Sequence, residues 1–229
     1  MSITAPVDAA KPTPKTGNEI FFQKHESFLA RAQAEPIDLL FLGDSITADW
    51  AQAPHIWDHY FGPYQAANFG IGGDQTQHII WRITQGELDH IHPKVVVLMI
   101  GTNNTHNFNG IQIASGIREI IRLIQVKIPQ AKILLLGILP RGPRINGNGL
   151  PDDWEDHMKV IRTTHSNVAQ LDDGDRIRFL DIGSHFLGND GTIPQSIMPD
   201  QLHLTPAGYQ LWADAMQPLL KEMMTSVND

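Results

Sequence analysis

Short apolar runs recur along the chain, and the clearest of them are typical of strands buried on both faces. The runs are rich in Val, Ile and Leu, lack polar alternation and end at turn residues, which is the pattern of parallel strands in a covered sheet. Runs at residues 37–43, 95–100 and 133–139 meet this description, and two further strands are predicted over residues 65–69 and 177–182.

The segments between these runs carry apolar residues at helical spacing. The clearest stripe consists of isoleucines, at positions 113, 117, 120, 121, 124 and 128, and it predicts a helix facing the sheet. Further helices are predicted after Asn18, around residues 56–61, 79–83 and 158–169, and after Thr205-Pro206, which is typical of an N-cap followed by proline. Alternating strands and helices predict right-handed crossovers and one α/β domain with a parallel sheet covered on both faces.

The predicted domain spans residues 18–229, and no internal repeat or second boundary divides it. Residues 1–17 are rich in Ala, Pro, Thr and Lys without a period, which predicts a flexible leader. They contain no hydrophobic stretch of the signal-peptide kind. We therefore expect a cytoplasmic protein if Met1 is the native start, and a periplasmic or secreted one if a leader was removed.

Composition narrows the classes of partner. The 229 residues are 41% hydrophobic and 18% charged, as in an ordinary globular domain, and the net charge of −8 argues against nucleic acid or an anionic membrane surface. The absence of cysteine excludes disulfides, thiolate metal sites and cysteine nucleophiles. No apolar run approaches the length of a membrane span.

Polar residues with catalytic potential follow the predicted strands. Asp44-Ser45 follows the first, Gly72-Gly73-Asp74 the second and Asn103-Asn104 the third, while Asp200 and His203 precede the last helix. The carboxyl ends of parallel strands meet at one edge, so these segments can converge. A serine nucleophile needs an imidazole base oriented by a carboxylate, and the developing oxyanion needs hydrogen-bond donors.

Each of these residues also has a purely structural interpretation. Ser45 could be only a helix N-cap, Asn103 could only hold a turn, and Asp200 with His203 could be a surface pair. Their occurrence together, in this order, favours the catalytic interpretation.

Metal and cofactor binding are not expected. His55 and His59 lie four residues apart, as paired metal ligands do, but no third ligand accompanies them at a recognisable spacing. The glycine cluster at residues 70–73 lacks the full dinucleotide-binding pattern.

The ordered blocks resemble those of the SGNH (GDSL) hydrolases. The blocks are Gly43-Asp44-Ser45-Ile46, Gly73, Asn103 and the pair Asp200 and His203. Within that family, residues 68–74, 101–104 and 139–142 are similar to the catalytic subunits of the type I platelet-activating-factor acetylhydrolase group. The resemblance extends from about residue 37 to the last helix and implies a three-layer α/β/α domain with a five-stranded parallel, flavodoxin-like sheet.

The resemblance also implies roles for individual residues. Ser45 would be the nucleophile, His203 the general base and Asp200 the group that orients the imidazole. The oxyanion hole would consist of the Ser45 and Gly73 N–H groups and the Asn103 side-chain amide.

Neighbouring residues Ile46, Thr102 and Leu202 would wall a small acyl pocket. Ile46 departs from the leucine of the family name, and we expect this mild change to narrow the pocket. The loops at residues 141–151 and 183–199 match the family less well, so the resemblance says least about the alcohol part of the substrate.

The sequence therefore predicts a metal-independent serine esterase that removes short acyl groups, acetyl foremost, from an acetylated sugar, a lipid or a small ester. A lysophospholipase or thioesterase acting on longer acyl chains is the alternative enzyme. A non-catalytic scaffold is the alternative outside enzymes, and the retention of every expected catalytic element speaks against it. The protein could assemble as a homodimer.

Overall fold

A five-stranded parallel sheet forms the centre of the protein. The computed structural model describes residues 8–145 and 149–225. The sheet has the order β2-β1-β3-β4-β5, the flavodoxin-like arrangement, and its strands are β1 (Leu39–Gly43), β2 (Ala66–Gly70), β3 (Val95–Met99), β4 (Lys132–Leu136) and β5 (Ile177–Leu180). The predicted fold class is confirmed, although β4 and β5 end two or three residues earlier than the apolar runs suggested.

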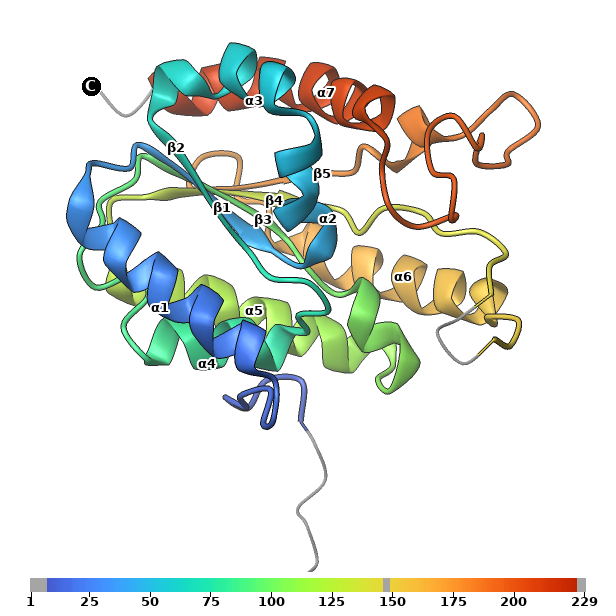
Figure 1. The fold of residues 1–229 in the computed structure, drawn as a ribbon, viewed down its shortest axis with the longest axis horizontal. Helices are drawn as coiled ribbons and strands as arrows, with labels where there is room; N and C mark the ends of the chain where they lie inside the picture. Colours follow the sequence, from blue (N-terminus) through green and yellow to red (C-terminus); the bar gives the residue numbers. More distant parts are fainter. Residues whose placement is uncertain (1–7, 146–148, 226–229) are drawn as a thin grey trace, which may run out of the picture.

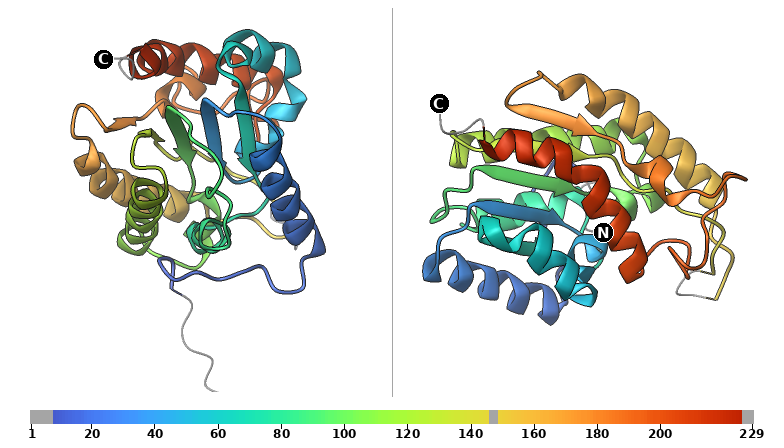
Figure 2. Two further views of the ribbon diagram at one scale, coloured as in Figure 1. Left: turned by 90° about the vertical axis from the view of Figure 1, so that its left-hand side faces the viewer. Right: turned by 90° about the horizontal axis from the view of Figure 1, so that it is seen from above.

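Helices cover both faces of the sheet, which gives three layers (Figures 1 and 2). One face carries α1 (Glu19–Ala34), α4 (Thr76–Thr84), α5 (Gly110–Lys127) and α6 (Trp154–Val168). The other carries α3 (Pro54–Tyr60) and α7 (Pro206–Thr225), and the short α2 (Ser45–Ala48) follows β1 directly. In the described part of the chain, no helix combines the length and the apolar character needed to cross a bilayer.

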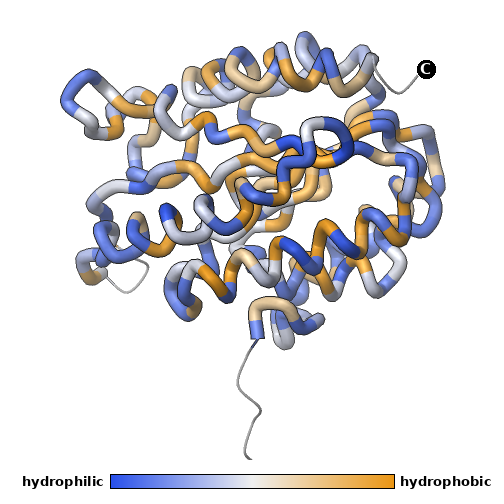
Figure 3. Tube along the Cα trace, turned by 180° about the vertical axis from the view of Figure 1, so that it is seen from behind, coloured by the Kyte–Doolittle hydropathy of each residue, from blue (hydrophilic) through white to orange (hydrophobic). Residues whose placement is uncertain are grey.

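Alternate residues of each strand pack into different cores. Leu40 and Val96 belong to the core under α1, α4 and α5, whereas Phe41 and Val97 belong to the core under α3 and α7. Successive side chains of a strand point to opposite faces, so a sheet covered on both sides needs strands that are apolar throughout. Figure 3 shows the hydrophobic strands enclosed between the helical layers.

Two glycines at strand ends let α2 approach the sheet. A Cβ at Gly43 would lie 2.0 Å from Thr47 Oγ1 and 2.6 Å from the Met99 carbonyl oxygen. A Cβ at Gly70 would lie 2.4 Å from the Ala48 nitrogen. Only glycine fits at these two positions. Because glycine has no side chain, the chain can turn from β1 into α2 at the edge of the sheet.

The segment before α1 differs from the flexible leader expected over residues 1–17. Residues 8–17 pack on the domain: Ala9 is 1% exposed, the Thr76 hydroxyl donates to its carbonyl over 2.7 Å, and the Thr13 N–H donates to the Gln77 carbonyl over 3.1 Å. These partners lie more than sixty residues further along the chain, so no local periodicity could indicate them. The remainder of the expected leader, residues 1–7, lies outside the described residues.

Candidate active site

Ser45, His203 and Asp200 form a continuous chain of hydrogen bonds. Ser45 is the first residue of α2, and its Oγ lies 3.0 Å from His203 Nε2. His203 Nδ1 lies 2.7 Å from Asp200 Oδ2. A carboxylate only accepts hydrogen bonds, so the Nδ1–H donates to it and Nε2 is left to accept the serine proton.

Backbone N–H groups that follow Asp200 in the chain fix the position of its carboxylate. Its Oδ1 accepts hydrogen bonds from the N–H groups of Leu202 at 3.1 Å and His203 at 2.7 Å. Burial raises the pKa of Asp200, whereas the hydrogen bonds from His203 and Leu202 lower it. The hydrogen bonds have the larger combined effect, so the pKa of Asp200 lies below its usual value. The carboxylate is therefore ionised at neutral pH. Arg144, in the loop before α6, places Nη2 3.3 Å from Oδ2, a contact that the sequence did not indicate.

A left-handed residue between Asp200 and His203 shapes this turn. Gln201 has φ = 62°, a conformation that is uncommon for residues with a side chain. Its Nε2 donates to the carbonyls of Ile193 and Met198, both at 3.2 Å, and its own carbonyl accepts from Gly142 N–H at 3.0 Å. These bonds hold the strained backbone in place.

The predicted oxyanion donors lie on the turn after β2 and on the 3-10 helix η3 (Thr102–His106) after β3. The turn is closed by an N–H of Asp74 donating to the Ile71 carbonyl at 3.1 Å, with Gly73 at φ = 72°, which glycine adopts readily. Asn103 Nδ2 donates to the Asp74 carbonyl at 2.9 Å. A carboxamide carries two N–H hydrogens, so one remains for an oxyanion.

Buried charges support the glycine turn from behind. Lys15 Nζ donates to the Gly72 carbonyl at 2.7 Å and lies 2.7 Å from Asp74 Oδ1. Arg82, which is fully buried, pairs with Asp74 at 3.0 Å and also with Glu87. Burial raises the pKa of Asp74, against the opposing effect of Arg82 and Lys15. Sequence reasoning missed Lys15, since it lies in the expected leader.

Asp44 is buried beside the nucleophile and caps α2. Its Oδ1 accepts from the Ile46 N–H at 3.0 Å. Burial raises the pKa of this carboxyl to about 7, with Asp74 adding to the rise and the Ile46 N–H opposing it.

The predicted acyl-pocket residues are adjacent in sequence to the triad and to the oxyanion donors. Ile46, Thr102 and Leu202 are all buried, and Ile46 and Leu202 belong to the same apolar cluster. On the side of Asp200, a cleft of about 780 Å³ is lined by residues of both loops that the sequence left undetermined, among them Arg144 and Ile193, and by Asp200 and Gln201. Of the three triad residues, Asp200 alone lines this cleft.

The chain is similar to known proteins over most of its length. A model of the GDSL-like lipase/acylhydrolase family matches residues 41–211. The chain belongs to this family. It is 38% identical over 220 residues to the platelet-activating factor acetylhydrolase IB subunit alpha1 of Bos taurus, covering 95% of this chain and 90% of that protein.

Solved structures share the fold of this GDSL-family chain at low identity. A GDSL-like lipase from Bacteroides thetaiotaomicron is 18% identical with a TM-score of 0.69, covering 88% of this chain and 98% of that one. An acetyl esterase crystallised with an acetate ion is 17% identical with a TM-score of 0.59, covering 84% of this chain and 100% of that one. The predicted family and enzyme class are confirmed: the protein is a carboxylic ester hydrolase, and its serine, histidine and aspartate agree with the family's serine triad.

Proposed function

We propose that this GDSL-family hydrolase removes short acyl groups, acetyl foremost, from oxygen esters by means of Ser45, His203 and Asp200. The observation that carries the proposal is the chain of hydrogen bonds from Ser45 Oγ through His203 to Asp200, at 3.0 and 2.7 Å. These distances are short enough for the proton transfers that the proposed roles require.

In the proposed reaction, Ser45 Oγ attacks the ester carbonyl carbon while its proton passes to His203 Nε2. The C–O bond to the alcohol then breaks, and the imidazolium returns the proton to the departing alkoxide. A water molecule repeats the sequence on the acyl-serine, releasing the carboxylic acid and restoring the Ser45 hydroxyl. Asp200 stays ionised and stabilises the imidazolium in both halves.

The negative oxygen of each tetrahedral intermediate would be met by three donors. As the first residue of α2, Ser45 has an N–H without a partner within its helix. The Gly73 N–H and the second hydrogen of the Asn103 carboxamide complete the set. Donors fixed in advance by the turn and by Asp74 lose little free energy to reorganisation during the reaction.

The preference for acetyl is supported by two observations. Ile46, Thr102 and Leu202, the residues proposed to wall the acyl site, are between 2% and 6% exposed, so little free space surrounds them. The Bos taurus relative is named as an acetylhydrolase. The cleft beside Asp200 would receive the alcohol part, which can belong to an acetylated sugar, a lipid or a small ester.

The experiment compares the parent with Ser45→Ala in aryl acetate hydrolysis and in labelling by a fluorophosphonate probe. We expect labelling of the parent at Ser45, and loss of both labelling and turnover in a folded variant, since this substitution removes little packing. Hydrolysis by Ser45→Ala at close to the parent rate would contradict the proposal.

We also propose a homodimer, which is supported by the name of the Bos taurus relative, described as a subunit. Light scattering coupled to size-exclusion chromatography measures the mass directly, and a mass of 25.5 kDa at all working concentrations would contradict the dimer.

A further inference from the structure

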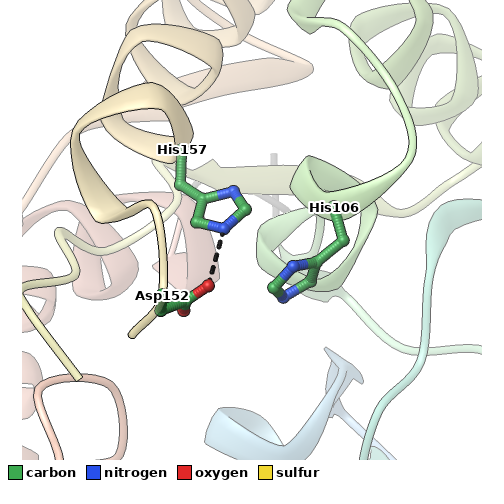
Figure 4. Close-up of side chains that lie close together, drawn as sticks. All are labelled: His106, Asp152 and His157. Carbon is green, nitrogen blue, oxygen red and sulfur yellow. Dashed lines mark hydrogen bonds and ion pairs between the residues drawn. The ribbon is translucent and has the colours of Figure 1, made fainter. Parts of the chain in front are cut away.

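A second cluster of titratable side chains lies outside the triad. His106 at the end of η3, Asp152 in the loop before α6 and His157 in α6 each present one ligand atom, and these atoms lie within 4.8 Å of one another. Figure 4 shows the two imidazoles and the carboxylate directed toward a common point. The residues are 46 and 5 positions apart in sequence, so only the fold brings them together.

The hydrogen bonds of His157 leave a ring nitrogen facing a carboxylate. Its Nδ1 lies 3.3 Å from the Thr105 carbonyl oxygen, which can only accept, so Nδ1 carries hydrogen. Its Nε2 then faces Asp152 Oδ1 at 3.0 Å. Two acceptors at this distance need a positive centre between them, either a second ring proton or a bound cation.

The pattern around His157 is that of a metal ligand. Metal-binding imidazoles almost always donate their second ring N–H to a carbonyl or a carboxylate, which fixes the tautomer. The Thr105 carbonyl meets this condition for His157. Asp152 is similarly oriented, since Arg141 donates to its other oxygen, Oδ2, and leaves Oδ1 directed to the cluster.

The third member of the cluster, His106, is exposed to solvent. The rings of His106 and His157 are already in contact, with centroids 4.4 Å apart.

We propose that His106, Asp152 and His157 form a binding site for one divalent transition-metal ion, with Zn²⁺ the best fit to the donor set. Two imidazoles and one carboxylate are ligands that zinc accepts, with water in the remaining position. His106 is exposed, so its side chain can move the short distance needed to close the site.

The proposed metal site lies between the cleft beside Asp200 and the 3-10 helix that carries Asn103. Asp152 also lines the 780 Å³ cleft beside Asp200. On the other side, Arg141 reaches the Thr102 carbonyl at 3.4 Å and the Thr105 hydroxyl at 3.3 Å, in the same 3-10 helix as Asn103. A bound ion would join this helix to the loop that carries Arg144, without taking part in the ester chemistry.

The test measures Zn²⁺ binding to the full-length, chelator-treated protein by competition with a fluorescent zinc indicator. We expect one equivalent of Zn²⁺ per chain and a loss of affinity of at least about 10–100-fold in His106→Ala, the size of effect seen even for partners outside the coordination sphere. Because His106 is exposed, this variant should fold, and circular dichroism checks that it does. His157→Gln should show the same loss.

The matched control is the double variant His55→Gln/His59→Gln, which removes a closely spaced histidine pair elsewhere in the protein, on α3. We expect this control to bind Zn²⁺ as the parent does. Co²⁺ provides an independent readout, since its visible absorption bands report the ligand geometry and should disappear in His106→Ala. Equal Zn²⁺ affinity in the parent and His106→Ala, or binding lost only in the α3 control, would overturn the proposal.

Discussion

At the scale of single residues, Asn103 combines a structural bond with a proposed catalytic one. Replacing it with alanine leaves the backbone of η3 but removes the third oxyanion donor. We expect kcat to fall by about 10²–10³ with little change in KM, because the donor stabilises the transition state more than the bound ester. Steady-state kinetics on an aryl acetate provides the measurement. A large rise in KM with kcat preserved would instead make Asn103 a substrate-binding residue.

The raised pKa of Asp44 predicts that the stability of the protein depends on pH. Its pKa rises from 3.8 to about 7 on folding, so between these values the folded protein holds a proton that the unfolded chain has lost. The contribution of Asp44 to the free energy of unfolding therefore falls as the pH rises from about 4 to about 7. Asp44→Asn keeps an oxygen to cap α2 but does not titrate.

We accordingly expect Asp44→Asn to gain stability relative to the parent across this pH range, by at most about 4 kcal/mol. Urea unfolding at several pH values compares the two proteins. A stability difference that stays constant over the range would show that Asp44 is not a buried, titrating acid.

At the scale of elements, residues 8–17 act as a support for the turn after β2. Lys15→Met removes the hydrogen bond to the Gly72 carbonyl and one of the two cations beside the buried Asp74. We expect a loss of stability of about 1–3 kcal/mol, the cost of leaving a buried polar group underpaired. We also expect a lower kcat on aryl acetates, because the Gly73 N–H is positioned by this turn.

Lys11→Met is the control for this prediction, since it makes the same charge change at an exposed residue of the same segment. It should match the parent in urea unfolding and in kcat. If Lys15→Met also matched the parent in both, residues 8–17 would pack on the domain without supporting its active site.

At the scale of the whole molecule, the proposed acyl pocket depends on three separate segments meeting at one edge of the sheet. Ile46 comes from α2, Thr102 from η3 and Leu202 from the loop before α7. β-Branched side chains at two of these positions have few rotamers in which to move away. A longer acyl chain would overpack this rigid site, which costs about 1–3 kcal/mol of strain. If that strain is felt in the transition state, kcat/KM falls by about one to two powers of ten.

We therefore expect the rate to fall steeply from acetate to butyrate to octanoate esters of one leaving group. Ile46→Ala and Leu202→Ala should flatten this series, mainly by raising the rates on longer chains. Chain-length profiles of kcat/KM for the parent and both variants provide the measurement. A parent that prefers octanoate would favour the lysophospholipase or thioesterase alternative.

The sequence indicated the strands and the identities of the proposed triad for separate physical reasons. Runs such as residues 95–100 are apolar at every position because both faces of the sheet are covered, and that signal is local. Ser45, Asp200 and His203 each follow a strand or precede a helix, where the parallel topology gathers chain ends, and the resemblance to the SGNH hydrolases assigned their roles. Helix caps were equally local, and Asn18 does cap α1.

Only the tertiary structure decided the contacts that position these groups. The Asp74 carbonyl orients the amide of Asn103, 29 positions away. Lys15 supports Gly72, 57 positions away, and Arg144 approaches Asp200, 56 positions away. The cluster of His106, Asp152 and His157 arises in the same way. Periodicity and capping report the environment within a few residues of a position, whereas these contacts depend on how crossovers return the chain to the sheet edge. The amino-acid sequence by itself therefore determined the fold class and the candidate chemistry, and the three-dimensional packing determined which side chains hold that chemistry in place.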